Sequence, residues 1–182
     1  TIPIRAEKKP IPLANFFAVL RDLLLAQKSL REDDQDLAFE LYESVWSVPF
    51  SLDDTLSPEY MYDVIANMGL VYSLRGDLER TIHFWRAGIE LKPEHVDLYH
   101  NLGATYAKMN KLDEAFAIWE QALALEPDRA VTHYNMGNAY YGRQSYEQAI
   151  AAWSRAIELD DQYVKVYYNI GNAHFNMNQL AR

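Results

Sequence analysis

The side chains that could do chemistry are few and lie far apart in the sequence. Five histidines are present, and none has a carboxylate or an imidazole four residues later, the spacing that would place two metal ligands on one helix face. Cysteine is absent, which excludes disulfides, thiolate metal sites and a cysteine nucleophile. The glycine-rich phosphate-binding and hydrolase motifs are also missing. We therefore predict a protein that is not an enzyme and uses no metal and no cofactor.

Carboxylates gather at expected helix boundaries rather than around a nucleophile or base. They are Asp33, Asp34, Asp36, Asp160 and Asp161. A carboxylate at the start of a helix accepts hydrogen bonds from free backbone N–H groups and lies favourably in the helix dipole. We expect these residues to cap helices rather than to catalyse proton transfer.

Composition narrows the class of partner. The 182 residues carry 17 Lys and Arg against 26 Asp and Glu, a net charge of −9, which disfavours nucleic acid. Hydrophobic residues make up 49%, enough to exclude general disorder.

The longest apolar stretch, residues 15–26, contains charges and is too short for a membrane span. We expect a cytoplasmic protein, with the periplasm or another soluble compartment left open.

Three residue types recur with a period of 34 residues, and such a period points to a repeat architecture. A small residue, a large aromatic and an amide each keep this register. The positions are Gly69, Gly103, Gly137 and Gly171; Trp85, Trp119 and Trp153; and Asn67, Asn101, Asn135 and Asn169.

Each repeat has the pattern of two helices. Apolar residues recur every three or four positions in residues 96–109 and again in residues 112–123, which is typical of amphipathic helices. Asn110 and Lys111 interrupt the pattern, and Pro127 ends it. The glycine allows the two helices to approach closely, and the tryptophan fills the space beside that contact. We predict helix, turn, helix, turn in each unit.

Residues 96–127 resemble a tetratricopeptide repeat (TPR) at every diagnostic position. Residues 130–161 also fit, whereas residues 62–95 depart at Thr81 and Gly88, and residues 164–182 supply only a first helix. The resemblance implies an all-α fold of about nine helices, a right-handed superhelical array of antiparallel helix pairs. The matching residues are Tyr99, Leu102, Gly103, Tyr106, Ala115, Trp119, Ala122 and Pro127.

We divide the chain into an extended N-terminal arm (1–13), a degenerate N-terminal helix pair (14–56) and a TPR array (57–182) of about three repeats plus the first helix of a fourth. The pair is interpreted as a cap or as a second interaction surface, and Ser57 is expected to cap the helix that follows it. Residues 178–182 match the start of a second helix. Either the native chain continues beyond Arg182, or this edge docks on a partner or a second copy. Self-association through the N-terminal helix or this edge is possible.

In the TPR family the first helix of each pair lines a concave face on which extended peptides bind. The resemblance therefore implies a protein–protein interaction scaffold. Asparagine amides could hydrogen-bond a peptide backbone, or could brace neighbouring helices instead, and aromatic rings would add contact area. Alternatives are a structural subunit of an assembly, or a regulatory or targeting module of a larger enzyme. The candidate peptide-binding residues are Asn67, Asn101, Asn135, Asn138, Asn169, Asn172, His100, Tyr134, Tyr141, Tyr168 and Phe175.

One known TPR activity is disfavoured by charge. TPR domains that bind chaperone tails hold a terminal carboxylate with lysine and arginine on the concave face. Two matching positions here are Asp63 and Asp97, which would repel an anion, and Lys165 alone fits. We do not expect a chaperone-tail clamp.

Overall fold

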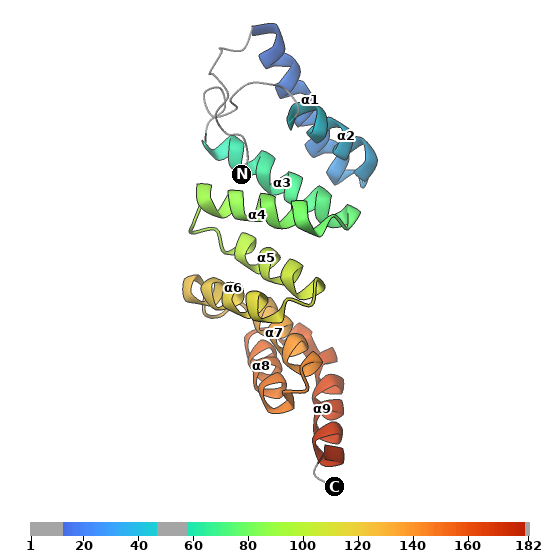
Figure 1. Ribbon diagram of the computed structural model, residues 1–182, viewed down its shortest axis with the longest axis vertical. Helices are drawn as coiled ribbons and strands as arrows, with labels where there is room; N and C mark the ends of the chain where they lie inside the picture. Colours follow the sequence, from blue (N-terminus) through green and yellow to red (C-terminus); the bar gives the residue numbers. More distant parts are fainter. Residues whose placement is uncertain (1–12, 47–57, 181–182) are drawn as a thin grey trace. The chain divides into compact units, whose positions relative to one another are not determined.

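The computed structural model describes residues 13–46 and 58–180, and these fold into nine α-helices and one short 3₁₀ helix (Figure 1). The all-α prediction and the expected number of helices are confirmed for these residues. The chain forms two compact units, Thr1–Pro93 and Glu94–Arg182. None of the described helices is long and apolar enough to cross a membrane.

The first unit contains two helix pairs. Helix α1 (Leu13–Arg31) packs against α2 (Gln35–Trp46), and α3 (Pro58–Arg75) packs against α4 (Leu78–Leu91). Contacts between α2 and α3 join the pairs. The apolar residues that meet along these helices form one core, which includes Leu23, Ala26, Tyr42, Val45, Val64, Met68, Val71 and Phe84.

Helix α1 keeps two large apolar side chains outside this core. Leu24 is 60% exposed and Leu25 is 43% exposed, while Leu23, directly before them in the sequence, is buried. The sequence prediction of a helix that is apolar around much of its circumference agrees with this placement. The structure does not describe four residues named in the sequence analysis of this region. They are Ser57 and the side chains of Phe16, Phe17 and Leu20.

The second unit repeats the same arrangement. Helices α5 (Val96–Lys108) and α6 (Leu112–Leu125) form one pair, and α7 (Ala130–Gly142) and α8 (Tyr146–Leu159) form the next. Helix α9 (Val166–Leu180) follows a 3₁₀ turn and packs on α8.

Glycine and tryptophan meet as the period predicts. Trp119 and Trp153 are each only 1% exposed, which confirms that they are core residues. A Cβ atom added at Gly103 would lie 2.4 Å from the indole of Trp119, and one added at Gly137 would lie 2.4 Å from that of Trp153. Neither glycine can therefore be replaced by a residue with a Cβ atom while the indole stays in place. A Cβ atom at Gly171 would have nothing within 4 Å.

The turn inside each pair places one residue in the left-handed region of backbone space. This residue has φ between 58° and 76° in every completed pair. The region favours glycine but also tolerates asparagine and aspartate. The residues are Asp33, Gly76, Asn110 and Gln144.

Residues 178–182 match residues 110–114 in the repeat register, which predicts a turn at Asn178, the equivalent of Asn110. This prediction is wrong, because α9 continues without a turn to Leu180. The equivalent Asn110 takes the left-handed conformation with φ of 58°, where a non-glycine residue carries a steric cost. At Asn178 the backbone remains helical instead.

Two of the five acidic residues expected at helix boundaries, Asp34 and Asp160, accept hydrogen bonds from backbone N–H groups. Asp34 Oδ1 accepts a hydrogen bond from the Leu37 backbone N–H at 3.1 Å, at the start of α2. Asp160 Oδ1 accepts one from the Gln162 N–H at 2.9 Å, at the start of the 3₁₀ turn. These hydrogen bonds satisfy backbone donors that the helices leave free.

An arginine contact links successive helix pairs in both units. Arg75 Nη2 lies 2.6 Å from Asp36 Oδ1, and its guanidinium stacks 3.9 Å from the Phe39 ring centroid. The contact joins α3 to α2, so the degenerate pair packs on the first repeat as a true repeat would. The equivalent contacts in the second unit, at 2.6 Å and 5.2 Å, join Arg143 to Asp113 and Phe116.

Candidate peptide-binding face

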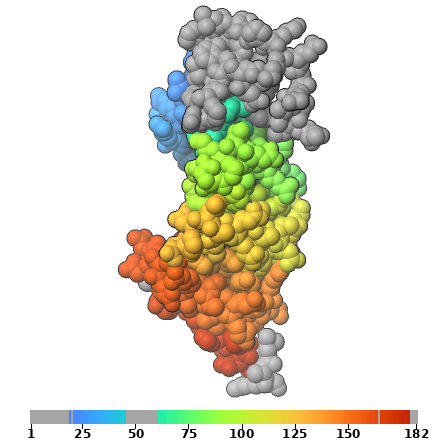
Figure 2. Space-filling view, turned by 90° about the vertical axis from the view of Figure 1, so that its left-hand side faces the viewer, coloured from blue at the N-terminus to red at the C-terminus, as the bar shows by residue number. Residues whose placement is uncertain are grey.

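A hollow of about 420 Å³ lies between the first helices α5 and α7 of the second unit. Its wall combines small residues, which leave room, with amide and ammonium groups, which can hydrogen-bond. Helices α8 and α9 contribute the orange-to-red surface of the same unit (Figure 2). The residues around the hollow are Ala104, Ala107, Lys108, Asn110, Leu112, Trp119, Asn135, Asn138, Ala139 and Gly142.

Asn138 is held by the tryptophan of its own repeat. The Trp153 indole N–H donates to Asn138 Oδ1 at 3.1 Å. An indole N–H can only donate, so it fixes the amide oxygen toward the core. Asn138 is exposed on α7, and its Nδ2 group remains available at the hollow.

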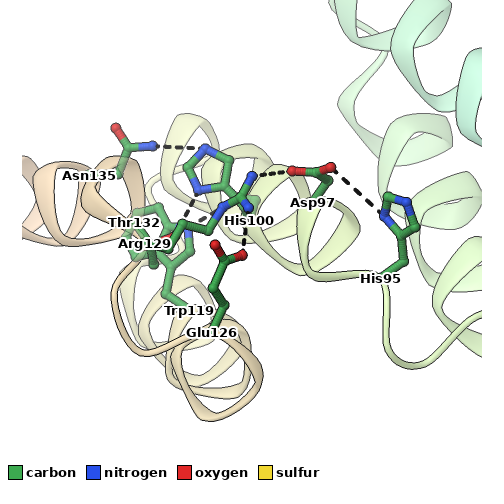
Figure 3. A network of polar contacts seen from close by, with 8 residues as sticks. All are labelled: His95, Asp97, His100, Trp119, Glu126, Arg129, Thr132 and Asn135. Atoms are coloured by element: carbon green, nitrogen blue, oxygen red, sulfur yellow. Dashed lines mark hydrogen bonds and ion pairs between the residues drawn. The ribbon is translucent and has the colours of Figure 1, made fainter. Parts of the chain in front are cut away.

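Asn135 is held by His100 (Figure 3). Asn135 Nδ2 lies 3.4 Å from His100 Nε2, and His100 Nδ1 lies 3.2 Å from Thr132 Oγ1. The Trp119 indole N–H donates to the His100 backbone carbonyl at 3.2 Å. These contacts tie the core tryptophan of α6, the imidazole of α5 and the amide of α7 into one polar network.

The surroundings of His100 favour its neutral form. Burial lowers the pKa of His100 below its ordinary value of 6.5, and the positive charge of Arg129 lowers it further, while Asp97 opposes the shift. Arg129 itself forms ion pairs with Asp97 and, at 2.9 Å, with Glu126. At neutral pH, Nε2 of the neutral ring therefore can accept a hydrogen bond from the Asn135 amide.

Helix α9 adds exposed aromatic side chains. Tyr168 is 75% exposed and Phe175 is 62% exposed. Asn172 lies between them, and the spacing of four and three residues places all three on one face of the helix. This face has large exposed aromatic rings, which are enriched in interaction surfaces.

Two of the candidate tyrosines are engaged in packing. The Tyr134 ring contacts the Tyr163 ring, with centroids 5.2 Å apart. The Tyr141 ring packs against Trp153 at 5.6 Å, and its hydroxyl accepts a hydrogen bond from Asn176 at 2.9 Å. Both are half-buried, so each presents only part of its ring to a ligand.

The structure does not gather all the candidate asparagines. Asn101 and Asn169 are half-buried on α5 and α9, outside the wall of the hollow. Asn67 lies on α3 in the other unit, so it is not part of this set. The sequence did not reveal Thr132, Arg129 or the hydrogen bonds of the tryptophans. The period located the tryptophan rings but carries no information about which edge of a ring faces an amide.

Comparisons with known proteins agree with this architecture. A family model described as TPR repeat matches residues 105–144 and 137–178, and one described as tetratricopeptide repeat matches residues 84–117. Together they extend over more than half of the chain, residues 84–178. The chain belongs to the tetratricopeptide repeat family. A search of curated protein sequences finds no match.

Solved structures show the same fold at low identity. The MamA protein is 19% identical with a TM-score of 0.73, covering 88% of this chain and 82% of MamA. MamA from Desulfovibrio magneticus RS-1 is 22% identical with a TM-score of 0.73, covering 88% of this chain and 85% of that one. The first TPR of Spaghetti (RPAP3), solved with the HSP90 peptide SRMEEVD, is 20% identical with a TM-score of 0.61, covering 64% and 93%.

Proposed function

We propose that this protein is an interaction scaffold that binds an extended segment of a partner protein across α5, α7 and α9. The observation that carries the proposal is the hollow between α5 and α7, with Asn135 and Asn138 in its wall. Its volume of about 420 Å³ lies in the range of ligand-binding pockets.

The chemistry of this face suits a peptide backbone. Ala104, Ala107 and Gly142 have little or no side chain, so a main chain can approach. Amides both donate and accept hydrogen bonds, as peptide units do. Tyr168 and Phe175 offer exposed rings to apolar side chains of the partner.

The charges favour a partner segment that is not strongly anionic. Asp97 is paired with Arg129, and Lys165 lies exposed in the 3₁₀ turn before α9. The RPAP3 domain was solved with an acidic peptide, and such a ligand would find few cations here. Binding should therefore depend little on salt, because screening acts on charge interactions.

A peptide-display selection on the full chain tests the proposal. The selected peptide is titrated by calorimetry into the wild type and into the Asn135→Ala/Asn138→Ala variant. Loss of about two hydrogen bonds should weaken affinity by roughly 5- to 150-fold. Gln148→Ala, which removes an exposed amide from α8, is the matched control and should bind normally.

Circular dichroism on the same preparations shows whether the double variant remains folded. Unchanged affinity in a folded double variant would exclude this face and favour the exposed leucines of α1. Failure to select any peptide, with the chain assembling at rising concentration in light scattering, would favour a structural subunit instead.

A further inference from the structure

We propose that at neutral pH Asn135 and Asn138 form a hydrogen-bonding pair of defined polarity, in which Asn135 accepts and Asn138 donates, and that His100 and Trp153 set this polarity. The inference rests on the proposed function, since it specifies how that site distinguishes the N–H from the C=O of a peptide. His100 and Trp153 act as positioning residues through the two amides.

The donor side of the pair follows from Trp153. Its N–H occupies Asn138 Oδ1 at 3.1 Å, and no rotation of the amide improves this contact, because Nδ2 would oppose another donor. The two N–H groups of Asn138 are therefore directed to the partner. Asn138 is presented as a donor to a carbonyl oxygen.

The acceptor side follows from His100. Nδ1 of His100 lies 3.2 Å from Thr132 Oγ1, and Nε2 lies 3.4 Å from Asn135 Nδ2. An amide nitrogen can only donate, so Nε2 is the acceptor and the proton of the neutral ring is assigned to Nδ1, from which it is donated to Thr132 Oγ1. The amide oxygen of Asn135 then points away from the ring, as Figure 3 shows. Asn135 is thereby presented as an acceptor for a backbone N–H.

The two amides lie three residues apart on α7, so they are neighbours on one helix face. An extended chain presents N–H and C=O groups in alternation along an edge. A fixed acceptor beside a fixed donor matches one N–H and a neighbouring C=O of such a chain. The pair therefore sets the register in which a peptide backbone binds, with an N–H opposite Asn135 and a C=O opposite Asn138.

The polarity of Asn135 should reverse in acid. A protonated His100 donates from both ring nitrogens, so Asn135 must turn its oxygen toward Nε2. The charged groups near the ring are Arg129 before α7, Asp97 on α5 and Glu126 after α6, and the pairs among them keep Arg129 in place. Among the described residues, the hydrogen-bond partner of the Asn138 side chain is Trp153, which does not titrate, so Asn138 should keep its polarity.

Side-chain amide spectra of the isotope-labelled full chain, without any ligand, test this directly. At neutral pH, His100 should be the tautomer protonated at Nδ1. On acidification, the Asn135 amide signals should shift with the His100 titration, while those of Asn138 stay constant. His100→Gln should abolish the shift, and His133→Gln, which alters another histidine near the start of α7, should preserve it.

A His100 protonated at Nε2, or Asn135 signals that ignore its titration, would overturn the inference while leaving peptide binding intact. Conversely, failed peptide selection would leave these spectra unchanged, so the two failures are distinguishable.

Two small probes test the polarity in binding. N-methylacetamide carries both N–H and C=O, whereas N,N-dimethylacetamide carries only C=O. The former should bind about 2- to 12-fold more tightly at neutral pH, the effect of one hydrogen bond. The preference should vanish in Asn135→Ala and persist in Gln148→Ala. Equal binding of both probes to the wild type would contradict an acceptor at Asn135.

Discussion

The tryptophans of the two units occupy equivalent positions but present different edges. In the first unit, a Cβ atom at Gly69 would meet the six-membered ring of Trp85, with Cε3 at 2.7 Å. In the second unit, Gly103 and Gly137 face the edge that carries Nε1 and Cδ1. The indole is thus turned relative to its helix pair, and its N–H points elsewhere.

The difference shows one packing motif serving two purposes. Trp85 Nε1 is buried and has no hydrogen-bond partner among the described residues, so this tryptophan contributes burial alone. Trp119 and Trp153 donate to His100 and Asn138, and so connect the core to the candidate peptide-binding face. The turned ring accompanies Thr81 and Gly88, which replace the alanines of the later repeats.

The largest expected effect is removal of a tryptophan from the second unit. Trp119→Ala should lower the free energy of unfolding by roughly 3–5 kcal/mol, because it leaves a cavity at a fully buried site. Urea titration followed by circular dichroism measures the loss. A loss below about 1 kcal/mol would mean that the ring is not essential to the core.

Two glycines of the second unit should respond in opposite ways. Gly137→Ala places a Cβ atom against the Trp153 indole and should cost roughly 1–3 kcal/mol by overpacking. Gly171→Ala meets open space and should stabilise α9 by up to about 1 kcal/mol, since alanine is the better helix former. Thermal melts compare the two. Equal destabilisation would show that the Gly171 position is packed.

Replacing tryptophan by phenylalanine isolates the indole N–H. Trp119→Phe removes the hydrogen bond to the His100 carbonyl, whereas Trp85→Phe removes a donor with no partner among the described residues. Trp119→Phe should therefore cost more, by roughly 1 kcal/mol. Denaturant titrations of both variants give the difference. A larger loss at Trp85 would contradict the comparison between the units.

The smallest effect concerns pH. The pKa of His100 is lowered by burial in the folded protein, so the unfolded chain binds a proton first as pH falls below about 6.5. Stability should decline from that pH downward until the folded-state pKa is passed. Melting temperatures of wild type and His100→Gln across this range should show a shallower decline in the variant. Parallel curves would indicate that His100 does not titrate differently on folding.

The sequence predicted the fold well because packing geometry itself has the 34-residue period. Gly103 and Trp119 constrain each other because the indole occupies the space that a Cβ atom at Gly103 would need. The spacing of the two residues in the sequence therefore predicts where the two helices pack. Asn178 has the same residue type as Asn110, yet α9 continues through it to Leu180. Residue type and period did not distinguish these two positions.

The candidate site was predictable in part. The expected face does contain Asn135 and Asn138 at a hollow, because the register of the first helices fixes which positions share a side. The hydrogen-bond partners of the amides could not be predicted. They depend on the rotamers of Trp153 and His100, and the sequence period does not specify side-chain rotamers. Tyr141 was expected to face a ligand and is largely occupied by packing, which depends on the neighbouring rings.

The most direct test of a peptide-binding face on α7 is to follow amide side chains while a display-selected peptide is titrated into the isotope-labelled full chain. The account predicts that the Asn135 and Asn138 signals shift in proportion to occupancy, while the Gln148 signals on α8 stay in place. Saturating binding that leaves both asparagine signals unchanged, with shifts confined to α1 and α2 or to α8, would contradict it.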